Sequence, residues 1–212
     1  RSTRLVNVFP CIFLFLLMGI LCFVSGIRLR YIFFAAAIVL AIFMLLIWQA
    51  PYRMSRITAY LDPWKDPKGS GFQIIQSFLA FGLGGIKGVG LGQSTQKLFY
   101  LPQSHTDFIF SIIGEELGLI GAAFVVTLYA AFFFFGNRLA QRTREPYTRL
   151  LAFSLVLFIT LQALINLLVA VGLIPTKGLP LPFVSYGGTA LVFHMISVGI
   201  LVAIDKRSIH FT

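Results

Sequence analysis

The acidic residue Asp107 is the first candidate for chemistry, because it stands where a polar stretch gives way to a long apolar run. It is the only carboxylate between Asp66 and Glu115. A carboxylate at a membrane boundary is costly to ionise and holds its proton more tightly, which suits a general base. Ser104 followed three residues later by Asp107 also matches a helix-capping box, and the residues by themselves favour that structural alternative.

Two further carboxylates, Glu115 and Glu116, follow inside the apolar run. On a continuous helix Asp107 and Glu115 would share a face about 12 Å apart. That separation exceeds the distance between two carboxylates that act on one glycosidic bond. We therefore expect the glutamates to form hydrogen bonds or an ion pair between helices.

Two glycine- and proline-rich stretches could also form a site. Residues 84–92 contain neither nucleotide-binding glycine motif in order, so nucleotide binding is not expected. Their backbone N–H groups beside Lys87 could hold a phosphate, although tight packing is the favoured alternative. Residues 175–188 contain three prolines and three glycines, and predict either a rigid turn or part of an outward-facing pocket. No His/Cys cluster has metal-ligand spacing, so no metal site is expected.

The elements that position these residues are membrane helices. The chain is 58% hydrophobic and 11% charged, with a mean hydropathy of +0.90, and a soluble domain would carry about twice that share of charge. We expect an all-α, polytopic membrane helix bundle with about five transmembrane helices. The apolar runs long enough to span the membrane are 8–27, 31–50, 109–135, 150–174 and 189–204.

The distribution of basic residues predicts the topology. Four arginines in the loop 136–149, together with Lys206 and Arg207, place that loop and the C-terminus in the cytoplasm. Residues 1–50 then form two spans, 51–108 a long extracytoplasmic loop, and 109–212 three spans with an outer loop at 175–188. Residues 72–82 of the long loop predict an amphipathic or re-entrant segment. The net charge of +10 belongs to loops on an anionic membrane, and nucleic-acid binding is not expected.

Several motifs together resemble the SEDS family (shape, elongation, division and sporulation proteins), bacterial membrane glycosyltransferases that polymerise lipid II. The resemblance is closer to the division branch, typified by FtsW, than to the elongation branch, typified by RodA. It implies about five spans here of about ten in all. One departure is 6–11, where the family usually shows an acidic Pro-Asp-Phe-Gly-type motif. The matching segments are 62–64, 71–77, 88–92, 96–97, 100–102, 105–110, 114–118 and 175–188.

The resemblance implies a catalytic role for Asp107 as the base for a sugar 4-hydroxyl that attacks C1 of a lipid-linked disaccharide. Undecaprenyl pyrophosphate leaves, and nearby cations stabilise its charge. A divalent cation could share that role, although the sequence shows no ligand set for one. The substrate-binding candidates are Lys97, Lys87, Lys177, Arg53, His105, Gln96 and Ser185.

The same resemblance implies a bacterial inner-membrane protein with an extracytoplasmic active site. Its implied partners are a class B penicillin-binding protein and other division proteins. Two other functions stay open on sequence grounds. Segments interrupted by glycine and proline near membrane spans also suit a lipid II flippase, and a non-catalytic scaffold of the division apparatus is the second alternative.

Overall fold

The computed structural model describes residues 8–48, 60–67, 69, 71–94, 108–175 and 179–210. All regular elements among these residues are helices, which confirms the expected all-α fold. The chain divides into two compact units, Arg1–Ser55 and Arg56–Thr212.

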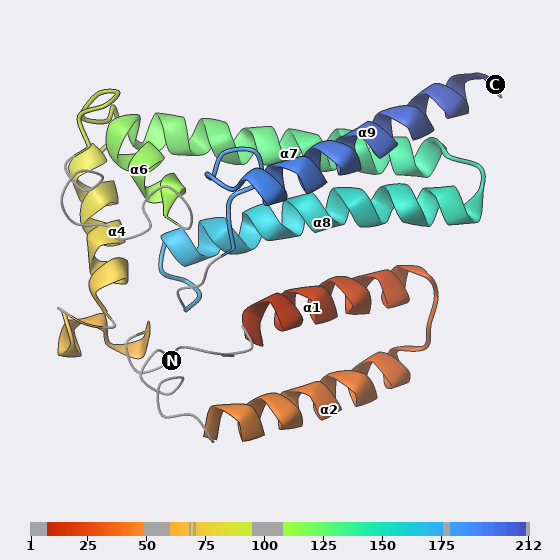
Figure 1. Ribbon diagram of the computed structural model, residues 1–212, viewed down its shortest axis with the longest axis horizontal. Helices are drawn as coiled ribbons and strands as arrows, with labels where there is room; N and C mark the ends of the chain where they lie inside the picture. The colour runs from red at the N-terminus through yellow and green to blue at the C-terminus, as the bar shows by residue number, and fades with distance from the viewer. Residues whose placement is uncertain are drawn as a thin grey trace. The chain divides into compact units, whose positions relative to one another are not determined.

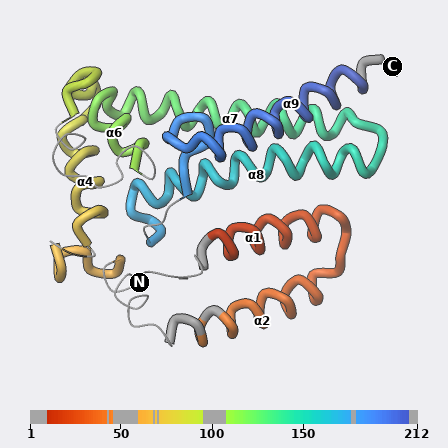
Figure 2. The backbone as a smooth tube through the Cα atoms, viewed as in Figure 1, coloured from red at the N-terminus to blue at the C-terminus, as the bar shows by residue number. Residues whose placement is uncertain are grey.

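The first unit contains a pair of apolar helices. Helix α1 (Val8–Val24) and helix α2 (Leu29–Trp48) pack against each other. The chain reverses between them through Gly26, whose φ of +84° is a conformation that glycine adopts without strain. Figure 2 shows this reversal. Helix α1 lies within the run predicted to span the membrane at 8–27, and α2 begins two residues before the run predicted at 31–50.

Three long helices dominate the second unit. Helices α7 (Gly118–Arg142), α8 (Pro146–Ala170) and α9 (Gly188–His210) pack against one another (Figure 1). Among the described residues, these three are long and apolar enough to cross a membrane. Their outer faces carry exposed apolar side chains such as Phe124 and Phe134, which suit contact with lipid. The chain is a multi-pass membrane protein.

The apolar run at 109–135 is not the single helix that its hydropathy suggests. Helix α6 (Ile109–Glu116) ends at Leu117, and α7 begins at Gly118 in a new direction. Gly118 has a φ of +66°, outside the range of a continuing right-handed helix. Hydropathy does not detect this break, because residues on both sides of it are apolar.

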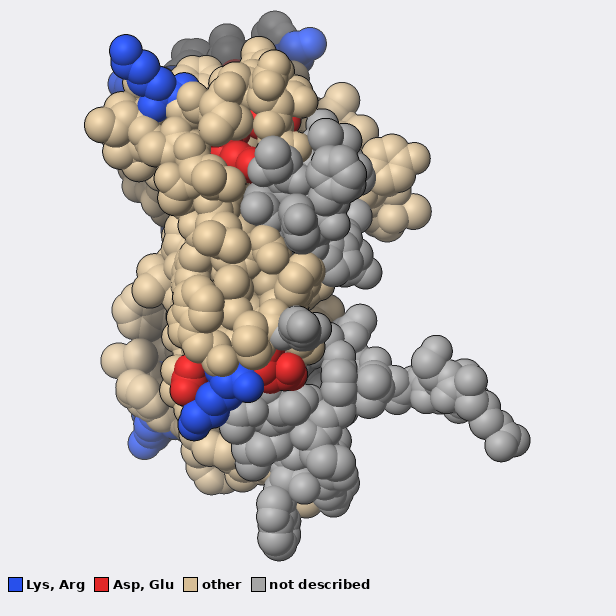
Figure 3. Space-filling model, turned by 90° about the vertical axis from the view of Figure 1, so that its left-hand side faces the viewer, with Lys and Arg blue, Asp and Glu red and all other residues tan. Residues whose placement is uncertain are grey.

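Helix α4 (Phe72–Gly84) lies across the ends of α7 and α8 near α6 (Figure 1). It follows a 3-10 turn, η1 (Pro63–Lys65), and occupies the residues predicted to form an amphipathic segment. One face of α4 is buried in the unit and the opposite face exposes Leu79 and Leu83. Helix α4 itself has no charged residue. Figure 3 looks onto this side, where charged side chains gather towards the two ends of an uncharged stretch.

Candidate functional site

Most of the predicted site residues lie outside the described residues. These are Asp107, Lys97, Lys177, Arg53, His105 and Gln96. Lys87 and Ser185 are described. The structure therefore describes the elements that neighbour the predicted site in sequence, beginning with Phe108, the residue after Asp107.

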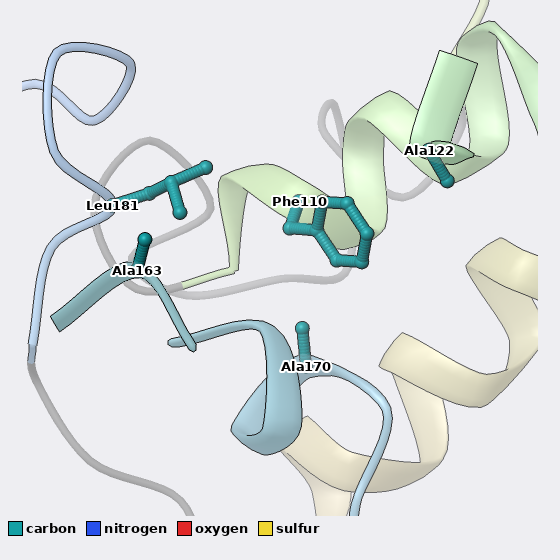
Figure 4. Packing of buried hydrophobic residues seen from close by; sticks show 5 residues of the cluster. All are labelled: Phe110, Ala122, Ala163, Ala170 and Leu181. Carbon is teal, nitrogen blue, oxygen red and sulfur yellow. The ribbon is translucent and has the colours of Figure 1, made fainter. Parts of the chain in front are cut away.

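Phe108 directly follows the predicted base. Its side chain is 1% exposed and packs with Val169 near the end of α8. Two residues later Phe110 joins a second buried cluster, drawn in Figure 4, which also contains Ala170 of α8 and Leu181 of the Pro-rich loop. The chain entering α6 is thus fixed against α8 and the Pro-rich loop.

Helix α4 is joined to α6 by a buried pair of serines. The Ser77 Oγ lies 2.6 Å from the Ser111 Oγ and 2.5 Å from the carbonyl oxygen of Ala170, at the end of α8. The carbonyl can only accept, so Ser77 donates to it and Ser111 donates to Ser77. One buried hydroxyl therefore connects α4, α6 and α8.

The same two helices meet again at a pair of glycines. A Cβ built on Gly84 would lie 2.0 Å from the carbonyl oxygen of Gly114, so the two backbones touch. Between this contact and the serines, the rings of Phe81 and Phe110 lie 5.7 Å apart. Ser77, Phe81 and Gly84 share one face of α4 because they are spaced at i, i+4 and i+7. This face sets the position of α6.

The glycine-rich loop caps the break between α6 and α7. Two of its N–H groups donate to the last carbonyls of α6, and two of its carbonyls accept from the first N–H groups of α7. These are groups that a helix end leaves without partners. The N–H groups at Val89 and Gly90 are therefore bonded within the protein, which favours the packing role over phosphate binding. The four bonds are Val89 N to Glu115 O, Gly90 N to Glu116 O, Leu119 N to Gly85 O and Ile120 N to Ile86 O.

The two glutamates of α6 behave differently from each other. Glu115 is 1% exposed, and its Oε2 accepts a hydrogen bond from the Ser94 hydroxyl, which lies in the loop after residue 90 and not on a second helix as predicted. Glu116 has a buried Oε1 that has no hydrogen-bond partner among the described residues. Lys87 is exposed and forms no ion pair with the residues that the structure describes. In the same part of the chain, no group of three or more His, Cys, Asp or Glu side chains could hold a metal ion.

The described part of the Pro-rich loop is held by polar side chains of the long helices. Asn166 Nδ2 donates to Leu179 O at 2.7 Å, and Gln162 Nε2 donates to Pro180 O at 2.8 Å. This irregular backbone is packed in protein, as a membrane boundary requires. Tyr129 of α7 donates to Pro182 O at 2.5 Å.

Ser185 has a role inside this loop, because its Oγ accepts a hydrogen bond from Leu181 N at 2.7 Å. Sequence reasoning missed Gln162, Asn166 and His194. Their signal was present: each is a polar residue within an otherwise apolar membrane run, where such residues usually have a partner or a function.

Comparison with known proteins identifies the family. The sequence profile described as "Cell cycle protein", which covers FtsW, RodA and SpoVE, matches residues 9–210. The chain belongs to this family. It is 48% identical over 188 residues to the "Probable peptidoglycan glycosyltransferase FtsW" of Geobacter sulfurreducens, an alignment covering 89% of this chain and 50% of the relative. It is 46% identical over 189 residues to "Stage V sporulation protein E" of Bacillus subtilis, covering 89% of this chain and 52% of the relative.

One solved structure has the same fold over most of this chain. It was described as "Structural coordination of polymerization and crosslinking by a peptidoglycan synthase complex". One of its chains matches with a TM-score of 0.70 and 28% identity, over 92% of this chain and 55% of that chain. The chain thus spans about half the length of the FtsW and stage V sporulation protein E relatives that it matches.

Proposed function

We propose that the protein is a peptidoglycan glycosyltransferase that polymerises lipid II into glycan strands during cell division. The observation that carries this proposal is the 48% identity to a probable peptidoglycan glycosyltransferase over 89% of the chain. The packing of Phe108, directly after Asp107, supports it because a catalytic group needs a rigid attachment.

In the proposed mechanism, Asp107 removes the proton from the 4-hydroxyl of one lipid-linked sugar. That oxygen forms a bond to C1 of the other disaccharide, and the bond from C1 to the phosphate oxygen breaks. Undecaprenyl pyrophosphate leaves with the electron pair, so no separate acid is needed. Cationic groups stabilise its charge as it develops; the candidates are Lys97, Lys87, Lys177 and Arg53, and His105, Gln96 and Ser185 are further substrate contacts.

The same proposal includes a location and a partner. The basic stretch 136–149, which comprises the end of α7, the turn after it and the start of α8, supports a cytoplasmic C-terminus in the bacterial inner membrane together with Lys206 and Arg207, with the site on the outer side. The solved peptidoglycan synthase complex, which concerns both polymerization and crosslinking, supports a class B penicillin-binding protein as the partner that crosslinks the new strand.

The decisive experiment replaces Asp107 with Asn in the full chain, purified and supplied with lipid II. We expect polymer formation to fall by at least about 100-fold, the contribution of a general base. Asp205→Asn, near the predicted cytoplasmic end, is the matched control and should polymerise at the parental rate. If the Asp107→Asn variant polymerised lipid II at the parental rate, Asp107 would not be the general base.

The same assays separate the two alternative functions. A parental protein that moves lipid II across liposomes without polymerising it would be a flippase. If the protein is a scaffold, the Asp107→Asn variant should still support division and still bind its partner. Loss of division with partner binding retained would exclude the scaffold.

A further inference from the structure

The histidine of α9, His194, is buried beside the side chain that holds the Pro-rich loop. It is 2% exposed, and its Nε2 lies 3.2 Å from the Oε1 of Gln162. Gln162 in turn donates its Nε2 to the carbonyl oxygen of Pro180. The rings of Phe158 and Phe183 lie 6.0 and 5.4 Å from the imidazole. His194, Gln162 and Pro180 therefore form a chain of contacts from α9 through α8 to the loop.

The directions of these hydrogen bonds follow from the chemistry of the groups. The Pro180 carbonyl can only accept, so the amide nitrogen of Gln162 must face it. The amide oxygen then faces His194, and because that oxygen also only accepts, the imidazole proton lies on Nε2. His194 thereby fixes which way the Gln162 amide points. If the amide turned over, its oxygen would face the oxygen of Pro180.

This hydrogen-bonded pair contributes little to the stability of the fold. The imidazole gains one hydrogen bond, but its buried Nδ1 has no hydrogen-bond partner among the residues that the structure describes. A buried acceptor without a donor costs about as much as one hydrogen bond contributes. An apolar residue at position 194 and another at 162 would fill the same space without that cost. What the polar pair supplies, and an apolar pair would not, is a fixed donor to Pro180.

We propose that His194 is a positioning residue for the glycosyltransferase reaction, acting through Gln162 on the Pro-rich loop. This inference rests on the proposed function, in which the loop carries Lys177 and Ser185. With Pro180 held, the loop keeps one conformation against the ends of the long helices. Without His194, the Pro180 carbonyl alone still orients the Gln162 amide, so the amide turns more often and the loop loses its donor for part of the time.

The test compares three variants in the full chain. His194→Phe keeps a ring of similar shape but removes the donor. The double variant with Gln162→Leu removes both polar partners. Ser197→Ala is the matched control, because within the described part of the chain the Ser197 hydroxyl bonds to Phe193 O of its own helix, at 2.8 Å, and to no other element. For each, three quantities are measured: the melting temperature, the hydrogen exchange of backbone amides in residues 179–187, and kcat and KM for lipid II.

The expected pattern separates positioning from stability. In His194→Phe the loop amides exchange about tenfold faster, the effect of one lost hydrogen bond. Its kcat/KM falls roughly 10- to 100-fold, because small displacements near a reacting centre are costly. The double variant regains the parental melting temperature but neither the slow exchange nor kcat/KM. Ser197→Ala resembles the parent in exchange and kinetics.

Two results would overturn the proposal. One is loop exchange in His194→Phe that equals the parent's. The other is a double variant in which exchange and kcat/KM recover together with stability, since that would make the pair merely structural. A parental protein that does not polymerise lipid II would contradict the proposed function. The exchange measurements need no substrate, so they would still show whether His194 holds the loop.

Discussion

The hydroxyl oxygens of Ser77 on α4 and Ser111 on α6 lie 2.6 Å apart, and both side chains are fully buried. The Ser77 hydroxyl also donates to the last carbonyl of α8. An interfacial helix with only an apolar contact could slide along its neighbours, whereas these directional bonds fix its register. Helix α4 is therefore part of the framework that positions α6, and α6 begins two residues after Asp107.

Ser77→Ala should lower the free energy of unfolding by about 1 kcal/mol, because Ala170 O and Ser111 each lose a buried partner. Ser154→Ala is the matched control, since its hydroxyl bonds to Leu150 O of the same helix and to no other described residue. Denaturant unfolding in detergent micelles measures both. A double-mutant cycle with Ser111→Ala should show positive coupling. Equal effects of Ser77→Ala and Ser154→Ala would contradict the connecting role.

Two glycines of α4 should respond in opposite ways to alanine. A Cβ at position 84 would lie 2.0 Å from Gly114 O, so Gly84→Ala must push α4 away from α6. We expect it to lower stability by about 2–3 kcal/mol. A Cβ at Gly82 meets nothing within 4 Å, so Gly82→Ala should be neutral or stabilise the helix by about 0.5–1 kcal/mol. Thermal melts of the two variants in the same detergent distinguish these outcomes.

The glycine-rich loop offers a second matched pair. Gly88 and Gly92 have almost the same φ, +80° and +78°. Gly92→Ala should cost only the left-handed strain of about 1–2 kcal/mol, because no atom lies near its Cβ. Gly88→Ala should cost clearly more, since its Cβ would lie 2.2 Å from Glu116 O and would open the cap over the helix break. Equal melting temperatures for these variants would show that the loop does not brace the break.

The sequence predicts the long helices well because their signal is local. Hydropathy placed the last apolar run at 189–204, and α9 contains it; α8 begins four residues before the run predicted at 150–174, because Pro146 suits a first helical turn. The break at Leu117 was not predictable from hydropathy. It depends on Gly118, whose Cβ would lie 2.4 Å from Gly88 N, a contact between residues far apart in the chain.

The candidate site also has a part that local sequence motifs predict and a part that depends on contacts between distant segments. Family motifs point to Asp107 as the base, but the partners of Gln162 and His194 depend on how α8, α9 and the Pro-rich loop come together. Spacing along a single helix does not contain that arrangement. A polar residue within an apolar run signals that some partner exists, but not which one.

The last prediction concerns Tyr129, whose hydroxyl donates to Pro182 O at 2.5 Å. Tyr129→Phe keeps the ring but leaves a buried carbonyl without a donor, so the free energy of unfolding should fall by about 1 kcal/mol. Tyr147→Phe is the matched control, because Tyr147 is 78% exposed and its hydroxyl is free to bond to water; that change should stay within about 0.5 kcal/mol of the parent.

The position of the effect matters as much as its size. Hydrogen exchange should quicken at Val184 and Ser185, whose N–H groups donate to Leu181 O beside Pro182, and should stay unchanged in α9. If exchange quickens throughout the unit instead, Tyr129 contributes to general packing and the loop has no separate attachment to α7. If it quickens only in the loop, the Tyr129 hydrogen bond holds this part of the loop in addition to the apolar packing of Leu181, and the loop opens without the bundle.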